Sequence, residues 1–172
     1  MAEGFDAGVR ESAAIVRESA AIERDMVQVR LTDPFRYVVV GTPDYLARHG
    51  VPEQPEDLRH ECITFRSQTT GALYAWELER GRKTWRVPVR GGVITNDGPL
   101  AVSMAELGLG LAYAFEPMVL DQLRAGRLRR VLEPYAAEAP GYFIYFPSRA
   151  QRSGPLRLFI EAARRFALRA MK

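Results

Sequence analysis

The chain is poor in cysteine and histidine, the residues from which disulfide frameworks and most zinc sites are built. It has one cysteine, Cys62, and two histidines, His49 and His60, among 172 residues. One thiol cannot form a disulfide within the chain, and neither histidine has a partner at metal-ligand spacing. We therefore expect no metal site, no cofactor and a reduced, cytoplasmic setting.

Long hydrophobic runs and blocks of like charge are also missing. The longest apolar stretch, residues 109 to 115, is far shorter than the roughly 20 residues that cross a bilayer. The first residues lack the basic and apolar regions of a secretory signal. The 24 Lys+Arg and 21 Asp+Glu residues give a net charge of +3 and are spread along the chain. The composition predicts a soluble globular protein with no membrane contact, and its charge alone does not predict nucleic-acid binding.

Signatures of common catalytic sites are absent as well. The sequence has no Gly-x-Ser-x-Gly elbow, no phosphate-binding P-loop and no His-Glu-x-x-His motif. The stretch "LGLGLA" carries a Gly-x-Gly at the end of an expected helix, whereas a dinucleotide fold needs it at the start. We assign no catalytic residues, and an enzyme remains possible only if its site is built from residues without a signature.

One feature that is present is a seven-residue repeat. "VRESAAIVRESAAI", residues 9 to 22, is VRESAAI written twice. On a helical wheel its Val, Ile and several Ala residues form one broad face and its Arg and Glu residues the other, which predicts a short amphipathic helix. Two heptads are too few to indicate a coiled coil.

Helices alternate with apolar strands over residues 36 to 170, a pattern typical of an α/β fold. The alternation predicts a mostly parallel sheet with one inserted antiparallel hairpin, on which Trp76 and Trp85 could form a cross-strand pair. We expect strands at 26 to 31, 36 to 41, 62 to 65, 109 to 115 and 141 to 147, and helices at 42 to 50, 54 to 61, 96 to 107, 116 to 126 and from 153 onward.

Two polar loops are candidates for binding a small ligand. "TNDGP", residues 95 to 99, begins a helix after an apolar strand, where free backbone N–H groups can bind an anion. Asn96 or Asp97 could equally be an ordinary helix cap. "RSQTTG", residues 66 to 71, offers hydroxyls and amides that could orient a ligand, although polarity is common in loops.

Several longer stretches carry a resemblance to a known family. They include "ERDMVQVRL", "RYVVVGTPDYLARHGVPEQPEDLRHECI", "ELGLGLAYAFEPMV" and "GYFIYFPSRAQRSGPLRLFIEAAR". In their order and spacing, from about residue 2 to 168, they resemble the effector-binding (LysR substrate-binding) domain of LysR-type transcriptional regulators. The family's spacing between "DAGVR" and "ERDM" is restored when one VRESAAI copy is deleted. The second copy therefore resembles a tandem duplication in a loop, where added length costs little.

The resemblance implies a periplasmic-binding-protein-like (type 2) α/β fold with one complete lobe and part of the other. We expect residues 37 to 145 to form the second lobe, and residues 1 to 36 and 146 to 172 to form part of the first. The family begins with a winged helix-turn-helix, a linker helix and the first βαβ units of lobe one, and we expect this chain to lack them.

The resemblance also implies a function. Family members bind a small organic effector between the lobes and form dimers or higher oligomers, so we expect an anionic effector, a homo-oligomer, and DNA contact only through the winged helix-turn-helix. The positions that match the family's effector site are Arg66, Ser67, Thr69, Thr70, Asn96, Asp97, Gly98 and Phe115, with Val9 and Arg10 on the first lobe. The alternatives are a stand-alone solute-binding protein, an enzyme and a non-functional gene fragment.

Overall fold

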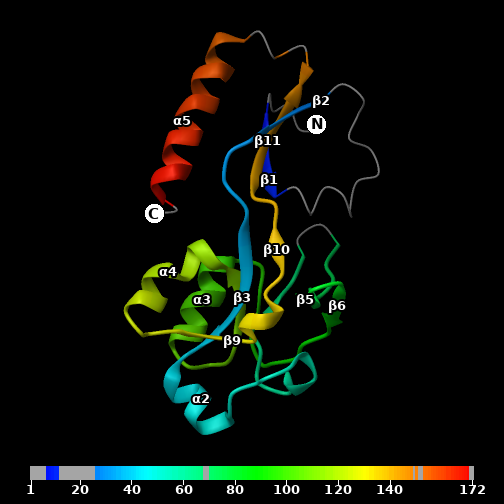
Figure 1. The fold of residues 1–172 in the computed structure, drawn as a ribbon, viewed down its shortest axis with the longest axis vertical. Coiled ribbons are helices and arrows are strands. Elements are labelled where there is room, and N and C mark those ends of the chain that lie inside the picture. Colours follow the sequence, from blue (N-terminus) through cyan, green and yellow to red (C-terminus); the bar gives the residue numbers. More distant parts are fainter. Residues whose placement is uncertain (1–6, 12–25, 68–69, 149, 151–152, 171–172) are drawn as a thin grey trace. The chain divides into compact units, whose positions relative to one another are not determined.

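The computed structural model describes residues 7–11, 26–67, 70–148, 150 and 153–170, which form two compact units (Figure 1). Unit 1 comprises Met1–Phe35 and Glu138–Lys172, and unit 2 comprises Arg36–Ala137. Over the described residues, every helix is too short or too polar to cross a membrane.

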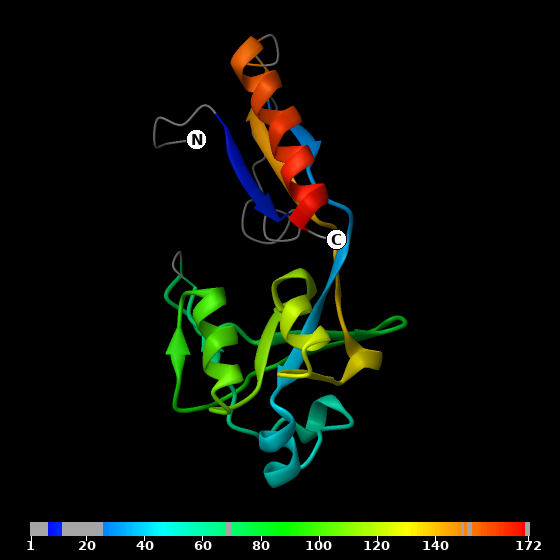
Figure 2. The ribbon, with the colours of Figure 1, turned by 90° about the vertical axis from the view of Figure 1, so that its left-hand side faces the viewer.

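The described part of unit 1 is a three-stranded antiparallel sheet with one helix. The sheet has the order β1 (Gly8–Glu11), β11 (Tyr142–Pro147), β2 (Met26–Arg30), and α5 (Gly154–Ala170) lies along one of its faces (Figure 2). The core between sheet and helix contains Ile144 and Phe146 from β11, and α5 contributes Leu156, Ile160 and Ala163 at spacings of four and three. This spacing places the three side chains on one face of the helix.

Unit 2 is built around β3, with helices and a hairpin packed about it (Figure 1). β3 (Phe35–Gly41) pairs with β8 (Ala112–Phe115) and β9 (Arg129–Val131), and β10 (Glu138–Ala139), at the boundary of the two units in the sequence, is also paired with β3. β4 (Thr64–Phe65) pairs with β7 (Ile94–Thr95), and β5 (Trp76–Arg80) with β6 (Lys83–Val87). The helices are α2 (Pro43–His49), α3 (Gly98–Glu106) and α4 (Glu116–Arg124), with 3-10 turns at Pro55–Asp57 and Glu133–Tyr135.

The core of unit 2 has two halves, one on each face of β3. Val39 packs with Tyr45, Trp76 and Leu111, whereas the adjacent Val38 and Val40 pack in a second cluster. Successive strand residues point to opposite faces. The continuous apolar run in β3 therefore indicates a strand that is buried on both sides. The second cluster also contains Ile63, Ala101, Val102, Ala105, Ala112, Ala114, Val119 and Leu128.

Most expected elements are present near their expected positions, because turn and cap residues mark their ends. Thr42 caps α2 by accepting a hydrogen bond from the Tyr45 N–H at 3.1 Å, Pro43 begins the helix, and Gly50 follows it with φ of 84°. The segment 54–61 differs from expectation, since it forms only the 3-10 turn Pro55–Asp57.

The expectation of a mostly parallel sheet is wrong. β3 is antiparallel to β8 and β9, and β11 is antiparallel to β1 and β2. Parallel pairing is found between β4 and β7 and at a bridge between Cys62 and Leu111. An alternation of helices and strands predicts parallel pairing only for two strands that a crossover helix connects. No helix separates β2 from β3 in the sequence, so the alternation does not predict how β3 pairs.

Three further expectations differ in detail. The start of the VRESAAI repeat lies in strand β1, not in a helix, and residues 12–25 lie outside the described residues. The units divide at 35/36 and 137/138, not at 36/37 and 145/146, because β11 pairs with β1 and β2 in unit 1. Trp76 and Trp85 are not directly opposite each other, since Trp76 is paired with Val87.

Candidate functional site

Three strands of unit 2 end at the same edge of the sheet. β4 and β7 are parallel, and the parallel bridge between Cys62 and Leu111 gives the chain leading into β8 the same direction. Arg66, Asn96 and Phe115 come at or just after the ends of these strands. The carboxyl ends of parallel strands are where α/β folds bind ligands.

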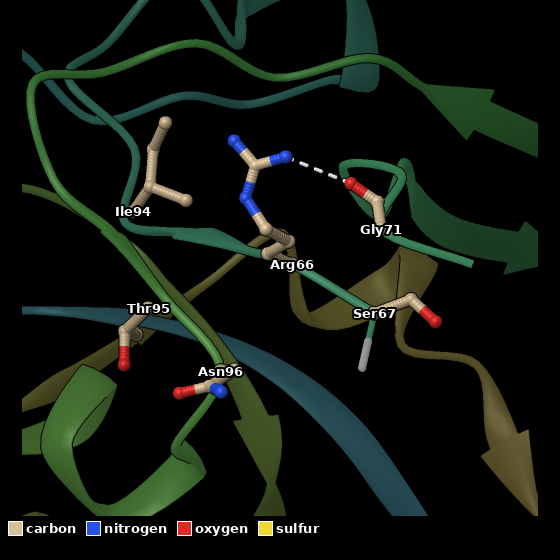
Figure 3. A pocket seen from close by; sticks show the side chains of 6 residues that line it. All are labelled: Arg66, Ser67, Gly71, Ile94, Thr95 and Asn96. Atoms are coloured by element: carbon tan, nitrogen blue, oxygen red, sulfur yellow. Dashed lines mark hydrogen bonds between the residues drawn. The ribbon is translucent and has the colours of Figure 1, made fainter. Parts of the chain in front are cut away.

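An open pocket of about 420 Å³ lies at this edge, entirely within unit 2 (Figure 3). We call it the Arg66 pocket, and it is lined by Arg66, Ser67, Gly71, Ile94, Thr95 and Asn96. Two sequence-distant loops thus meet: the loop after β4 and the loop between β7 and α3.

Arg66 is held by hydrogen bonds at both its backbone and its side chain. Its backbone N–H donates to the Thr95 carbonyl at 2.7 Å, which joins the two loops. Its Nη1 donates to the Gly71 carbonyl at 2.8 Å (Figure 3). The guanidinium carries several further N–H donors and a permanent positive charge. Arg66 therefore presents a positioned cation on the pocket wall.

The loop after β4 is shaped by its own hydroxyl groups. The Ser67 Oγ accepts from the Thr70 N–H at 3.2 Å, and the Thr70 Oγ1 accepts from the Ala72 N–H at 3.3 Å. The Gly71 N–H donates to the Ser67 carbonyl at 2.9 Å, with Gly71 at φ of 70°. Each hydroxyl accepts within the loop and still has a proton to donate. Thr69 lies outside the described residues.

The start of α3 has a protein cap. The Asp97 Oδ1 accepts from the Leu100 N–H at 2.7 Å, and the Asp97 N–H donates to the Thr95 Oγ1 at 3.1 Å. The structure therefore favours the cap interpretation of "TNDGP" over anion binding by the helix N-terminus, because the carboxylate already offsets its positive end. Asn96 lines the pocket, whereas Gly98 lies within the helix and approaches Met118.

The remaining expected residues do not line the Arg66 pocket. Phe115 ends β8, and its ring lies 4.7 Å from that of Tyr37. Val9 and Arg10 lie on β1 in unit 1, where Val9 is half-exposed. Gly71, Ile94 and Thr95 also line the pocket; Gly71 and Thr95 belong to the two loops expected to bind a ligand, whereas Ile94 was not expected there. Thr95 is the first residue of the "TNDGP" loop, and the position of this loop after an apolar strand was the feature of the sequence that could have indicated Thr95 as a pocket residue.

Other polar clusters of the described residues do not suggest a metal or catalytic centre. No group of three or more His, Cys, Asp or Glu side chains there could hold a metal ion. Cys62 is buried, and burial raises the pKa of its thiol to about 12, with the Glu61 carboxylate acting in the same direction. A thiol in this state is a poor nucleophile at neutral pH.

Comparison with known proteins identifies related sequences over nearly the whole chain. The family model of the LysR substrate binding domain matches residues 3–167. A putative transcriptional regulator of Pseudomonas aeruginosa is 39% identical over 165 residues, which cover 95% of this chain and 52% of that protein. The HTH-type transcriptional regulator PgrR of Escherichia coli is 32% identical over 162 residues, 94% of this chain and 52% of PgrR. The chain thus spans about half the length of these relatives.

Solved structures show the same fold. The CrgA regulatory domain from Neisseria meningitidis matches with a TM-score of 0.74 and 19% identity, over 95% of this chain and 76% of that domain. The regulatory domain of AphB from Vibrio vulnificus matches with a TM-score of 0.72 and 19% identity, over 92% of this chain and 74% of that domain. The protein has the periplasmic-binding-protein-like type 2 fold, and it belongs to the LysR substrate-binding domain family, whose members here are transcriptional regulators and not enzymes.

Proposed function

We propose that this chain is the effector-binding and oligomerisation part of a LysR-type regulator, and that the Arg66 pocket binds the carboxylate of a small organic effector. The observation that carries the proposal is the guanidinium of Arg66, fixed by the Gly71 carbonyl on the wall of a pocket at the carboxyl edge of the sheet. The pocket volume of about 420 Å³ is within the usual range for small-molecule sites.

The side chains around Arg66 suggest how such a ligand would be held. The guanidinium would pair with the carboxylate through charge-assisted hydrogen bonds. The Ser67 hydroxyl and the Asn96 amide can bind further ligand oxygens, and the exposed Ile94 side chain offers an apolar wall. Asp97 adds a negative charge at the neighbouring helix start, so we expect a monocarboxylate to bind better than a phosphate or a dicarboxylate.

The rest of the expected site is also part of the proposal. We assign unit 2 to the complete second lobe and unit 1 to part of the first, and we propose Thr69, Thr70, Gly98 and Phe115 of unit 2 as further effector-contacting positions. Val9 and Arg10 of unit 1 stay positions that the family resemblance alone suggests. The family membership supports this assignment.

The proposed partners follow from the relatives. PgrR is named as an HTH-type regulator, and this chain covers 52% of its length. We therefore propose that DNA is contacted only through a winged helix-turn-helix, that the protein acts in the cytoplasm, and that it works as a homodimer or higher oligomer.

Thermal melting with a panel of aromatic and aliphatic carboxylic acids tests the effector proposal. A ligand that binds only the folded chain raises the melting temperature by mass action. We expect at least one monocarboxylate to stabilise the wild-type chain, and we expect Arg66→Gln to weaken its binding by about tenfold or more, the usual scale for a hydrogen bond to a charged group.

The matched control is Arg82→Gln, which removes an exposed arginine from the turn between β5 and β6. It should bind the acid as the wild type does. Equal binding by the wild type and Arg66→Gln would contradict the assignment of Arg66.

A further inference from the structure

Two half-exposed aliphatic side chains flank Arg66. Ile94 on β7 is 49% exposed, and Leu73, in the segment between Gly71 and β5, is 47% exposed. Single exposed aliphatic residues are common on protein surfaces. These two lie on either side of a fixed cation at a pocket, so their positions bear on the kind of ligand that Arg66 binds.

Leu73 lies directly beside Arg66 in an antiparallel bridge. The Ser67 N–H donates to the Ala72 carbonyl at 2.9 Å on one side of the bridge, and the Tyr74 N–H forms a bond of 2.8 Å on the other side. Hydrogen bonds that bracket a bridge in this way define a non-hydrogen-bonded pair, in which the side chains are closer. Opposite residues of an antiparallel pair point to the same face. The Leu73 side chain is therefore a direct neighbour of the Arg66 side chain.

Ile94 approaches Arg66 from the strand on the other side of β4. In the parallel pair of β4 and β7, Ile94 is in register with Thr64, two residues before Arg66. Residues two apart on a strand share a face, and so do residues in register on neighbouring strands. Figure 3 shows the Ile94 and Arg66 side chains extending to the same side of their strands. Both side chains line the Arg66 pocket.

A cation between two aliphatic side chains fits a ligand with one charged end and one hydrocarbon part. Small-molecule sites commonly combine apolar walls with a few placed polar groups. An acid whose carboxylate pairs with Arg66 brings the group on its carboxyl carbon to Ile94 and Leu73. Contact there removes apolar surface of both partners from water, which favours binding. Neither flank offers a ring on which an aromatic acid could stack.

We propose that the effector is an aliphatic monocarboxylate, with its carboxylate on Arg66 and its hydrocarbon chain against Ile94 and Leu73. The inference rests on the proposed function and names the class of ligand for the same pocket. Because each buried methylene adds to the transfer free energy, affinity should rise with chain length until the flanks are covered.

A chain-length series tests the ligand class. The probes are the straight-chain acids from acetate to hexanoate, with benzoate and cyclohexanecarboxylate as a pair of similar size. NMR titration of the 172-residue chain gives a dissociation constant for each acid. We expect affinity to rise about twofold to fourfold per added methylene, the upper value being that of a fully buried methylene. Cyclohexanecarboxylate should bind more tightly than benzoate.

Leu73→Thr/Ile94→Thr tests the two flanks directly. This variant should bind acetate as the wild type does and lose most of the gain per methylene, because the hydrocarbon then meets hydroxyl groups. The matched control is Val51→Thr/Leu107→Thr, which replaces two exposed aliphatic residues of unit 2 that do not line the Arg66 pocket. It should keep the wild-type dependence on chain length. Circular dichroism melting shows whether both double variants fold, and the wild-type series is decisive without them.

The outcomes separate this inference from the proposed function. The aliphatic class is overturned if wild-type affinity does not depend on chain length, if benzoate binds more tightly than cyclohexanecarboxylate, or if the folded Leu73→Thr/Ile94→Thr variant keeps the wild-type dependence. The proposed function survives these results when Arg66→Gln still weakens the binding of every acid. Both proposals are overturned if no acid binds, or if Arg66→Gln binds every acid as the wild type does.

Discussion

Arg66 and Asp97 together set the charge at the edge of unit 2. Arg66 is anchored by the Gly71 carbonyl, and Asp97 is anchored by the Leu100 N–H. Both charges are fixed by backbone groups, the Gly71 carbonyl in a loop and the Leu100 N–H in the first turn of α3, and do not depend on flexible side-chain partners. This arrangement favours a ligand with one negative end placed at Arg66 and a neutral, hydrogen-bonding part near Asn96.

The buried thiol of Cys62 gives a residue-scale prediction. The side chain is 2% exposed and its pKa is raised to about 12 by burial, so only roughly 1 in 10,000 chains carries the thiolate at pH 8. We expect a thiol-reactive disulfide reagent to leave the folded chain unmodified over an hour. In denaturant it should modify one thiol per chain. Labelling within minutes without denaturant would show that Cys62 is accessible.

His60 gives a prediction about pH. Burial lowers the pKa of His60 from 6.5, and the nearby His49 adds to this effect. Because the folded-state pKa is the lower one, the unfolded chain binds more protons between the two values. Stability from neutral His60 is therefore fully present above pH 6.5 and is lost as pH falls through the folded-state pKa.

The melting temperature of the wild type should fall between pH 7.5 and pH 5.5, a range above that in which most carboxylates titrate. His60→Gln should flatten this dependence. A wild-type melting temperature that is constant or rises on acidification would contradict the assignment.

Single residues of the pocket were only partly predictable from sequence. "RSQTTG" and "TNDGP" could be selected because polar loops after apolar strands often bind ligands. That these two loops meet could not be predicted, because it depends on the parallel pairing of β4 with β7 and on the bond from the Arg66 N–H to the Thr95 carbonyl. The sequence also left open whether Asp97 caps α3 or binds a ligand, because this depends on the direction of its side chain, which accepts the Leu100 N–H.

At the scale of elements, the segment that carries Cys62 is held close to the loop that leads into β7. The Cys62 N–H donates to the Arg90 carbonyl at 2.9 Å. A Cβ added at Gly91 would overlap the Cys62 carbonyl oxygen and lie 2.8 Å from the Cys62 nitrogen. Only a glycine fits this approach of two backbones.

Gly91→Ala should therefore destabilise unit 2 by about 1–3 kcal/mol, the usual cost of overpacking a filled site. Urea denaturation measures the free energy of unfolding directly. The matched control is Gly92→Ala, where the nearest heavy atom is the flexible Glu61 side chain at 4.0 Å. Equal stabilities for the two variants would contradict the close approach.

Helices and strands differed in how well their sequence patterns predicted them. α2, α3 and α4 lie within the expected ranges because caps, an early Pro or a following Gly mark their ends. The expected parallel direction of the strands was wrong, because a run of apolar residues does not indicate which strand it pairs with or in which direction. The stretch 54–61 has a Pro and a capping box like a helix start but few apolar positions beyond them, and it ends after one 3-10 turn.

At the scale of the whole molecule, the chain folds into two units with separate cores. Unit 2 has a two-sided core around β3, whereas the described core of unit 1 lies between a three-stranded sheet and one helix. The family resemblance predicted the type 2 fold, which the comparisons confirm. The division that it implied at 145/146 falls inside "GYFIYFP", whereas the pairing of β11 with β1 and β2 keeps that strand whole in unit 1.

An NMR titration tests whether the Arg66 pocket binds the effector. The titrant is the carboxylic acid that raises the melting temperature most. If the pocket is the effector site, the backbone amides of Ser67, Gly71 and Asn96 should shift saturably in the wild type and much more weakly in Arg66→Gln. Saturable shifts that leave these amides unchanged and map elsewhere would contradict it.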